Sequence, residues 1–576
     1  MITDKKTNII AILLLSITFL IGFFSVKNNS LTFDELSHIP AGYSYLTQQD
    51  FRINPEHPPF IKDLSAIPLL FLDLNFPSES SAWQEGINNQ WDFGNKFIFH
   101  SGNNADQIVF LARIPMLFVL VFLGWFLFKW AKEKYGNKTA LFVLVLFSFS
   151  PSLIAHGRLV TTDLGATFGF VVSTYFWLKF LKNPSRKNII ITSLVFGFTI
   201  LLKFSMALLV PFFGIITLIY VFLKNKNLFE YLIKSVLVGL IAVIFVVWPV
   251  YQWHVMNYPP ERQLRDTTRM LAKNFFDPLR NLLISISNIP ILRSLGLYFT
   301  GLLMATQRTM FGNTTFFLGK LNNASFKNYF QIVYLLKAPI ALHVLTITAL
   351  LVFIVKRFKK QTQSIKEKLK NNFTELSMLI FLAIYWLTSA FGNLNLGIRH
   401  LLPVFPFTYM LVSSYLVKSI QKSKKQTIKV MGSAFILFSL GWYSASSVLN
   451  YPYYIPYFNE MIGTNDGYKY VVDSNYDWGQ DLKRLKKWVE ENNIEKIKID
   501  YFGGADVNYY FPEKAEWFDA RKEKPKGYIA VSATLLQSGT GKPLPSFEYD
   551  GGYYRWLQDY KPIAKAGKSI FIYYIP

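Results

Sequence analysis

Eleven long apolar runs divide the 576-residue chain, and they constrain its fold more than any other feature. With 51% hydrophobic residues, the chain is too apolar for a soluble protein of this size. A helix satisfies its own backbone polar groups, so runs of this length are typical of segments that cross a bilayer. We therefore predict a polytopic α-helical membrane protein with about eleven transmembrane helices, near 8–26, 108–128, 139–155, 163–181, 188–204, 206–223, 232–250, 337–355, 376–391, 400–417 and 429–448.

The net charge of +24 follows the topology of these runs and does not indicate a nucleic-acid surface. In the N-terminus and every second loop, 24 Lys or Arg residues face only four Asp or Glu residues. The first loop on the other side, 27–107, has ten acidic and four basic residues. This is the positive-inside pattern. It predicts a cytoplasmic N-terminus and three large outer segments, 27–107, 251–336 and the tail after residue 448.

Three further observations bear on the compartment. The first apolar run is longer than the core of a signal peptide and lacks a small-x-small cleavage site, so we interpret it as a membrane helix. The chain has no cysteine, which excludes disulfides, Cys-ligated metals and a thiol nucleophile. Its richness in Lys, Asn, Ile and Phe suggests an AT-rich bacterial genome, hence the plasma (inner) membrane, with the endoplasmic reticulum as the alternative.

The tail differs in character from the rest, which suggests two domains, 1–450 in the membrane and 451–576 outside it. Its short alternating runs predict strands at 470–473, 497–499, 527–532 and 569–574. Asp477 is expected to cap a helix that follows it. We predict a small extracytoplasmic α/β domain that handles the acceptor or covers the site, without a part in the chemistry.

Carboxylates gather in the first two outer loops. Asp34 and Glu35 follow the first apolar run, and Asp163 stands in the short second outer loop. Asp34 and Asp163 could each simply cap a helix. Their functional interpretation is catalysis, with Asp34 as the general base for an acceptor hydroxyl, Glu35 structural or assisting, and Asp163 positioning the sugar or acceptor.

Basic residues at the outer boundary are conspicuous because the positive-inside rule should deplete them there. Each could snorkel to lipid headgroups. Together with the outer carboxylates, however, they favour a shared anionic ligand such as a lipid phosphate, which arginine grips bidentately. These residues are Lys62, Arg113, Arg158, Lys203, Lys337 and Arg399.

Histidines near the first carboxylates leave a divalent metal as an open alternative. His38 follows Asp34 by four residues, and Glu56 and His57 are adjacent. The Asp-Glu-x-x-His order is not the His-Glu-x-x-His zinc motif. We therefore interpret the histidines as hydrogen-bonding groups and predict no required cofactor.

Several motifs resemble those of the C-type glycosyltransferases of the protein O-mannosyltransferase family, which includes the enzymes that attach aminoarabinose to lipid A. The resemblance covers nearly the whole chain, except that 251–336 is too short for the β-trefoil of the eukaryotic members. The motifs are Asp34-Glu35, the His-Pro-Pro-x-x-Lys of His57 to Lys62, Arg158 five residues before Asp163, Phe317-Leu-Gly319, Tyr329-Phe330, Lys337-Ala-Pro339, Gly397-Ile-Arg399-His400 and Asp473-Ser-Asn475-Tyr-Asp477-Trp478-Gly479-Gln480-Asp481.

The resemblance implies the C-type fold, a polyprenyl-phosphate monosaccharide donor, and inverting transfer to an extracytoplasmic protein, lipid or glycan acceptor. A phosphate leaving group held by cations needs little acid assistance, so one carboxylate base suffices. The implied substrate-binding residues are His57, Lys62, Arg158, Lys203, Lys337, Arg399 and His400.

Three other functions would also explain parts of the chain. A transporter or flippase of lipid-linked sugars would explain the spans, but the expected paired discontinuous helices are not evident. An oligosaccharyltransferase would carry a Trp-Trp-Asp motif, which the sequence lacks. A scaffold that binds partners through its tail would use the tail's Tyr and Trp residues, which core packing explains equally well.

Overall fold

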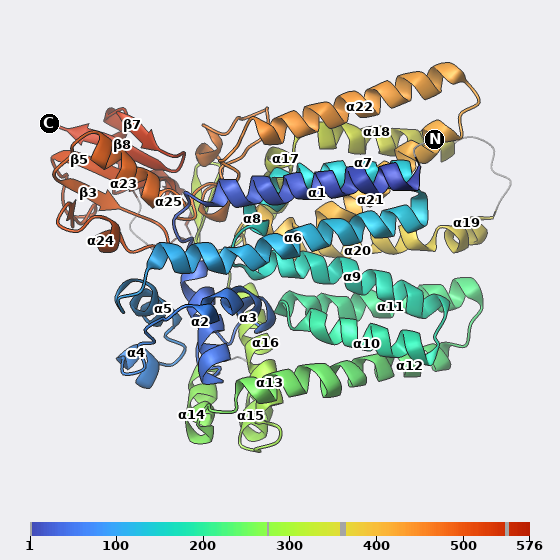
Figure 1. Ribbon diagram of the computed structural model, residues 1–576, viewed down its shortest axis with the longest axis horizontal. Coiled ribbons are helices and arrows are strands. Elements are labelled where there is room, and N and C mark those ends of the chain that lie inside the picture. Colours follow the sequence, from blue (N-terminus) through green and yellow to red (C-terminus); the bar gives the residue numbers. More distant parts are fainter. Residues whose placement is uncertain (1–2, 273–275, 358–363, 546, 548–551) are drawn as a thin grey trace.

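The computed structural model describes residues 3–272, 276–357, 364–545, 547 and 552–576. Long helices run roughly side by side, with the N-terminus at one end of the bundle and the C-terminal sheet at the other (Figure 1). The tail therefore lies at the end of the bundle opposite the N-terminus. The basic loop at 356–370 was predicted to be an inner one, and its residues 358–363 lie outside the described residues.

Each predicted apolar run coincides with a helix, but not every helix is long enough to span. Within the described ranges, seven helices are long and apolar enough to cross a membrane, or up to nine if two bent pairs each count as one span. The seven are α1 (Asp4–Val26), α6 (Ala105–Tyr135), α9 (Thr162–Lys182), η2–α11 (Phe204–Lys224), α12–α13 (Leu228–His254), α20 (Phe373–Phe391) and α22 (Gln426–Val448).

The bent pairs and two shorter helices account for the difference from the predicted eleven. Helices α7 (Asn137–Ser148) and α8 (Pro151–Gly157) meet at 60°, and α17 (Tyr329–Lys337) and the start of α18 (Ile340–Arg357) meet at 109°. Helix α10 (Arg186–Ile200) has 15 residues, about 22 Å at 1.5 Å per residue, which falls short of a core of about 30 Å. Helix α21 (Val404–Gln421) has 18 residues, and its Pro, Thr, Tyr, Ser, Lys and Gln residues make it less apolar than the seven.

Apolar side chains on the outside of the bundle identify the surface that faces lipid. Helix α12 (Leu228–Ala242) exposes Phe229, Val236 and Leu240, and the turn that continues it exposes Phe245. In water such a surface would be unfavourable, whereas in a bilayer it contacts acyl chains. The inner faces pack on one another through buried apolar residues and hydroxyls that bond to the helix backbone.

Short helices fill the two outer segments. The first segment contains α2 (Glu35–Gln48), α3 (Phe60–Ala66), η1 (Ile67–Phe71), α4 (Ser81–Gln84) and α5 (Gln90–Phe99). The second contains α14 (Pro260–Met270), α15 (Asp277–Ser287) and α16 (Arg293–Phe311), after α13 (Trp248–His254).

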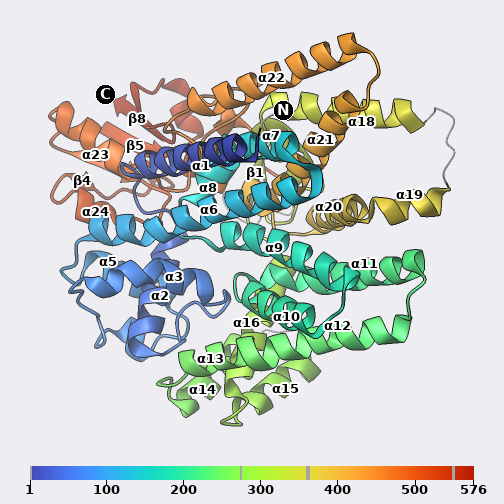
Figure 2. The same cartoon turned by 45° about the vertical axis from the view of Figure 1, so that its right-hand side comes forward.

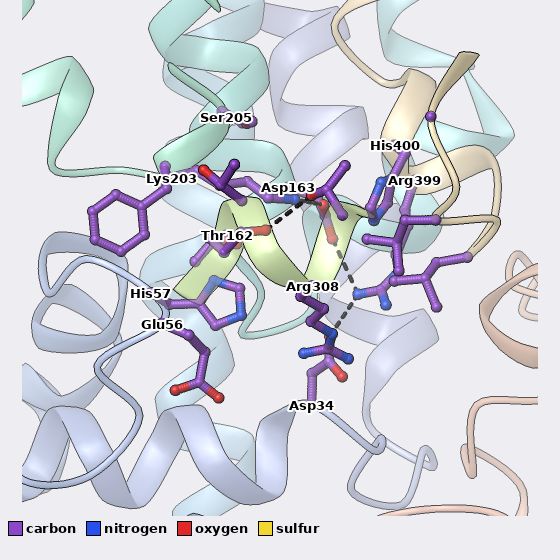
Figure 3. Close-up of a pocket in the computed structure, with 18 of the residues that line it drawn as sticks. Asp34, Glu56, His57, Thr162, Asp163, Lys203, Ser205, Arg308, Arg399 and His400 are labelled. Atoms are coloured by element: carbon purple, nitrogen blue, oxygen red, sulfur yellow. Dashed lines mark hydrogen bonds and ion pairs between the residues drawn. The ribbon is translucent and has the colours of Figure 1, made fainter. Parts of the chain in front are cut away.

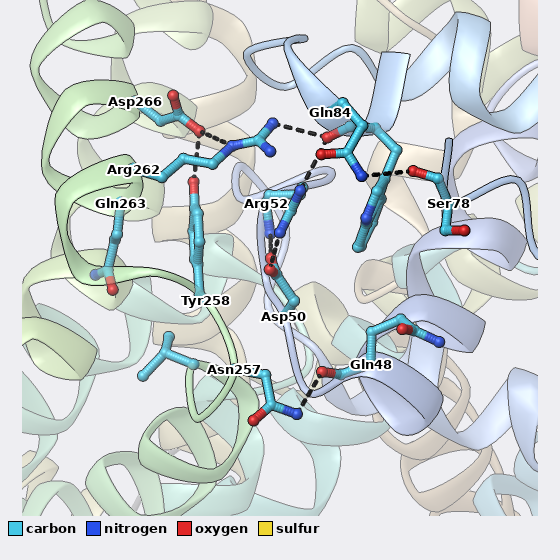
Figure 4. A network of polar contacts seen from close by, with 12 residues as sticks. Gln48, Asp50, Arg52, Ser78, Gln84, Asn257, Tyr258, Arg262, Gln263 and Asp266 are labelled. Atoms are coloured by element: carbon cyan, nitrogen blue, oxygen red, sulfur yellow. Dashed lines mark hydrogen bonds and ion pairs between the residues drawn. The ribbon is translucent and has the colours of Figure 1, made fainter. Parts of the chain in front are cut away.

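A polar network fastens these two outer segments together (Figure 4). Arg52 donates to the carbonyl of Trp83 at 2.9 Å and lies over its indole ring, with 4.1 Å from Cζ to the ring centroid. Arg262 of α14 donates to the same carbonyl at 2.8 Å. Arg262 and the Tyr258 hydroxyl both donate to Asp266, at 3.4 and 2.8 Å. The network fixes the relative position of the two segments, both of which line the cavity described below.

The tail forms a five-stranded sheet of order β4-β3-β5-β8-β7. The predicted strands at 497–499, 527–532 and 569–574 are confirmed as β3 (Ile497–Asp500), β5 (Gly527–Ser532) and β8 (Ile570–Ile575). The edges are β4 (Ala515–Glu516) and β7 (Ala564–Ala566), and the helices are α23 (Leu482–Glu491), α24 (Val507–Tyr510) and α25 (Ala533–Thr540).

Two predictions for the tail were wrong. Residues 470–473 form turns and a single bridge, from Val471 to Phe317, because that segment packs against the membrane part and has no place in the sheet. Asp477 does not cap the following helix, which begins at Leu482. Its carboxylate instead accepts a hydrogen bond from the Thr534 backbone at 2.9 Å.

The tail is joined to the membrane part by backbone pairing. Strand β6 (Lys542–Pro543) pairs with β2 (Lys320–Asn322), which pairs with β1 (Thr315–Phe317) of the second outer segment. The backbone N–H groups of Ser30 and Phe33 donate to the carbonyls of Gln480 and Trp478, at 3.0 and 3.1 Å. The tail therefore packs beside the residues that lead to Asp34.

Candidate active site

A cavity of about 400 Å³ lies where the first loop, the start of α9, the end of α16 and the segment before α21 meet (Figure 3). Charged and imidazole side chains from elements far apart in sequence converge on it. Most of them lie in the first and second outer loops, and Arg308 is the one that the sequence did not point to. They are Asp34, His38, Glu56, His57, Asp163, Lys203, Arg308, Arg399 and His400.

Four of these side chains form a chain of alternating charge. Arg399, in the short helix η4 (Ile398–Leu401), places Nη1 2.5 Å from Asp34 Oδ2 and 3.4 Å from Asp163 Oδ2. Lys203 Nζ lies 2.5 Å from the other oxygen of Asp163. Asp163 is thus held by two cations, whereas Asp34 has one.

The two aspartates differ in accessibility as well as in partners. The side chain of Asp34 is 22% exposed and that of Asp163 only 2%. Burial raises the pKa of Asp34, but the Arg399 guanidinium and His38 outweigh burial and hold this pKa below its ordinary value. Asp34 is therefore a carboxylate at neutral pH, and a second molecule can reach it more easily than Asp163.

Glu35 lies outside the cavity. Its carboxylate forms a bidentate ion pair with Arg113, at 2.8 and 2.5 Å, and accepts hydrogen bonds from the backbones of Thr32 and Val160. All of these groups are buried. The pair ties the start of α2 to α6 and to the second outer loop, which favours the structural interpretation of Glu35 over a catalytic one.

Lys62 also points away from the cavity. Its ammonium donates to the Tyr45 hydroxyl (2.7 Å), to both side-chain and backbone oxygens of Asn54 (3.0 and 2.8 Å) and to the carbonyl of His57 (2.7 Å). Burial lowers the pKa of this amine to about 7, against the opposing effect of Glu56. The predicted phosphate contact would require Lys62 to give up these bonds, so its present geometry favours holding the 54–62 turn.

Two other predicted phosphate ligands are buried behind the site. Lys337 donates to the carbonyls of Ile455 and Asn475, at 2.7 and 2.6 Å. Arg158 lies over the ring of Tyr454, with Cζ 5.5 Å from its centroid. Neither is among the described residues that line the cavity. Both contact residues of the tail, which favours a role in holding the tail against the bundle.

Arg308 is a lining residue that the sequence analysis missed. It lies near the end of α16, is exposed, and forms no ion pair with a carboxylate in the described part of the chain. Figure 3 shows its guanidinium in front of Asp34. The sequence signal for it is an arginine near the end of a largely apolar run, Leu295 to Phe311, in the outer segment 251–336.

The histidines and Glu56 line one side of the cavity. The rings of His38 and His57 meet edge to face, with centroids 5.1 Å apart, and His38 Nδ1 lies 2.9 Å from the carbonyl of Val160. Glu56 accepts from the amides of Asn88 (3.0 Å) and Gln90 (2.6 Å). Among the described residues, no group of three or more His, Cys, Asp or Glu side chains could hold a metal ion.

The chain is similar to known proteins in both sequence and fold. Residues 98–253 match the family model of dolichyl-phosphate-mannose-protein mannosyltransferases. The structure is similar to the crystal structure of ArnT from Cupriavidus metallidurans bound to undecaprenyl phosphate, with a TM-score of 0.50 and 11% identity over 98% of this chain and 97% of that one. No curated protein sequence matched the chain.

A second solved structure is more distant. The oligosaccharyltransferase of Archaeoglobus fulgidus, in the apo form, aligns with 88% of this chain and 64% of its own, at 12% identity and a TM-score of 0.46. The fold assignment rests on the similarity to ArnT together with the family match. The chain is a multi-pass membrane protein with the fold of the C-type glycosyltransferases.

Proposed function

We propose that the chain transfers a monosaccharide from a polyprenyl-phosphate donor to a hydroxyl, or a similar nucleophile, of an extracytoplasmic protein, lipid or glycan. The observation that carries this proposal is that an accessible carboxylate, Asp34, shares a single cavity with three cations and pairs directly with one of them, Arg399. Support also comes from a solved structure of the same fold that is bound to undecaprenyl phosphate. We place the protein in the plasma membrane with its N-terminus in the cytoplasm and its tail outside.

The donor phosphate would bind Arg308, Lys203 and Arg399. Arg308 carries a charge that no described carboxylate neutralises, and Lys203 is 16% exposed at the cavity. Negative charge grows on the leaving phosphate oxygen as the glycosidic bond breaks, so fixed cations stabilise the transition state more than the ground state. The lipid tail would leave the cavity towards the exposed apolar faces of the helices.

Asp34 would act as the general base. It takes the proton of the acceptor hydroxyl while the acceptor oxygen forms a bond to the anomeric carbon and the bond from that carbon to the phosphate oxygen breaks. The electron pair of the broken bond stays on the phosphate, and a single displacement inverts the anomeric configuration. Asp163, which is buried between two cations, would hold Arg399 and Lys203 in place.

Phosphate binding and base strength are coupled through Arg399. A phosphate that binds the guanidinium shares it with Asp34, so the positive charge next to Asp34 is partly neutralised. The pKa of Asp34 then rises towards the value at which a carboxylate is an effective base. The arrangement favours a reaction in which the donor binds before the acceptor is deprotonated.

Mass spectrometry of envelope glycans and lipids, in cells with and without the gene, tests the proposal. We expect one class of envelope component to lose a single monosaccharide and a polyprenyl-phosphate sugar to accumulate. The gene should restore the monosaccharide, and the gene encoding Asp34→Asn should not. Identical glycan and lipid profiles in both strains would contradict the proposal.

A further inference from the structure

One tryptophan of the tail contacts both Arg399 and the residue directly before Asp34. Trp478 is 1% exposed, and the Arg399 guanidinium lies over its indole with Cζ 4.3 Å from the ring centroid. The backbone carbonyl of Trp478 accepts a hydrogen bond of 3.1 Å from Phe33, the residue directly before Asp34. The ring therefore meets the cation, and the backbone meets the segment that presents the carboxylate.

We propose that Trp478 is a positioning residue for the proposed transfer: it orients the Arg399 guanidinium and fixes the segment that carries Asp34. This inference rests on the proposed function. It gives the tail a part in the chemistry, in contrast to the expectation that the tail only covers the site or handles the acceptor.

The surroundings of Trp478 leave its ring and backbone little freedom. Its backbone N–H donates to the side-chain oxygen of Gln480 at 2.8 Å, and the Gln480 side-chain amide donates to the carbonyl of Tyr476 at 3.0 Å. The indole also meets the His156 ring edge to face, with ring centroids 5.8 Å apart. Both Trp478 and Gln480 are buried.

Gly479 allows the segment to approach so closely. Its φ is +90°, a left-handed conformation that side-chain-bearing residues rarely adopt, and a Cβ there would lie 2.5 Å from the Cα of Gly503. The turn lets the carbonyls of Trp478 and Gln480 both accept from the 30–33 segment. The sequence Trp478-Gly479-Gln480 thus has a geometric reason at each position.

The ring matters because the guanidinium must face two carboxylates at once. A cation over an indole face is attracted by the ring quadrupole, which also fixes the plane of the guanidinium. Without the ring, Arg399 can rotate away from Asp34 and Asp163, and its effect on both the donor phosphate and the base weakens. The titratable and charged groups that face Asp34 are His38, Asp163, Arg308, Arg399, His400 and Asp473.

Three variants of the full-length protein in lipid nanodiscs test this role. Trp478→Leu removes the aromatic face, and Trp478→Phe keeps one. Trp488→Leu is the matched control, because Trp488 lies in the same domain on α23 and packs on Tyr528, with ring centroids 6.3 Å apart. The measurements are binding of undecaprenyl phosphate, and hydrolysis by water of a panel of undecaprenyl-phosphate monosaccharides as a function of pH.

For Trp478→Leu we expect a three- to tenfold rise in donor KM, about the effect of losing one partly buried cation–π contact. The acidic limb of its kcat/KM profile should shift to higher pH, because Asp34 loses part of the neighbouring positive charge. Trp478→Phe should bring the donor KM and the acidic limb most of the way back to their wild-type values, and Trp488→Leu should match wild type. A purely structural role would lower the amount of folded protein without moving the pH limb.

Two negative results have different meanings. If wild type neither binds undecaprenyl phosphate nor hydrolyses any donor of the panel, the proposed function itself fails. If wild type does both and folded Trp478→Leu has the donor KM and pH profile of Trp488→Leu, the function stands and the positioning role of Trp478 is wrong.

Discussion

Arg399 pairs with Asp34 through a contact of 2.5 Å, so the proposed base and a proposed phosphate ligand are direct partners. The same guanidinium nitrogen lies 3.4 Å from Asp163. Donor binding and base strength are therefore expected to depend on each other, and single substitutions should separate their effects on affinity and rate.

Asp34→Asn tests the base. The amide keeps the shape of the carboxylate but cannot accept a proton, so kcat should fall by about 10²- to 10⁴-fold, the usual contribution of a general base. Binding of undecaprenyl phosphate should persist or tighten, because Arg399 loses its competing anion. Asp92→Asn, a change at an exposed carboxylate of the same loop, is the control. Near-normal turnover in Asp34→Asn would assign the base to another carboxylate of the cavity.

Arg308→Gln tests the unpaired cation of the cavity. A hydrogen bond to a charged group contributes about 1.5–3 kcal/mol, so kcat/KM for the donor should fall by roughly 10- to 100-fold. Arg280→Gln is the matched control, because Arg280 pairs with Asp277 on α15 in the same outer segment. Equal donor kinetics in the two variants would leave Arg308 without a role in phosphate binding.

Glu35→Gln tests the structural interpretation of the buried pair with Arg113. Removing one partner leaves a buried charge without compensation, which typically costs about 3–5 kcal/mol of folding free energy. We expect a lower apparent unfolding temperature in detergent, partly recovered in the double variant Glu35→Gln/Arg113→Gln. A stable but inactive Glu35→Gln enzyme would instead support direct participation of Glu35 in catalysis.

The tail should show a pH-dependent stability that arises from Asp477. Burial raises the pKa of this carboxyl to about 7, above its value in the unfolded chain. The folded tail then binds more protons than the unfolded one between about pH 4 and 7, so its free energy of unfolding falls as pH rises through that window. In Asp477→Asn this fall should be smaller, and the variant should gain stability relative to wild type above pH 7.

Hydrogen exchange of tail amides at pH 5 and pH 8, corrected for the intrinsic pH dependence of exchange, measures the free energy of unfolding of the tail at each pH. The Asn side chain keeps an oxygen for the Thr534 backbone N–H, so the fold should persist. Parallel protection in wild type and Asp477→Asn at both values would show that Asp477 is already ionised in the folded tail at pH 5.

The sequence predicted the membrane helices well because apolar runs determine them locally. It also predicted β5 and β8, in which consecutive β-branched and aromatic residues favour buried strands. The number of spans was less predictable. Whether α10 and α21 span the bilayer depends on where each helix begins and ends and on how it packs against its neighbours. The pattern of apolar residues determines neither of these.

The site was predictable in part. Asp34 and Arg399 meet in the cavity, but Lys62 turns inward because its partners, Tyr45 and Asn54, come together only when the loop folds. Adjacent residues also separate: Asp34 faces the cavity, whereas Glu35 faces Arg113. Such directions depend on tertiary contacts between residues far apart in sequence, such as Glu35 and Arg113, 78 positions apart, and no local motif encodes these contacts.

Single-turnover chemistry with a polyprenyl-phosphate sugar tests the central claim most directly. The purified full-length protein, in nanodiscs, would be mixed with a smaller amount of each labelled undecaprenyl-phosphate monosaccharide, so that enzyme sites exceed donor. The released sugar and its anomeric configuration would be followed. We expect the wild-type protein to release undecaprenyl phosphate and a sugar of inverted configuration from at least one donor. The Asp34→Asn variant should bind the donor and leave it intact. Release with retained configuration, or release by Asp34→Asn at the wild-type rate, would contradict the central claim.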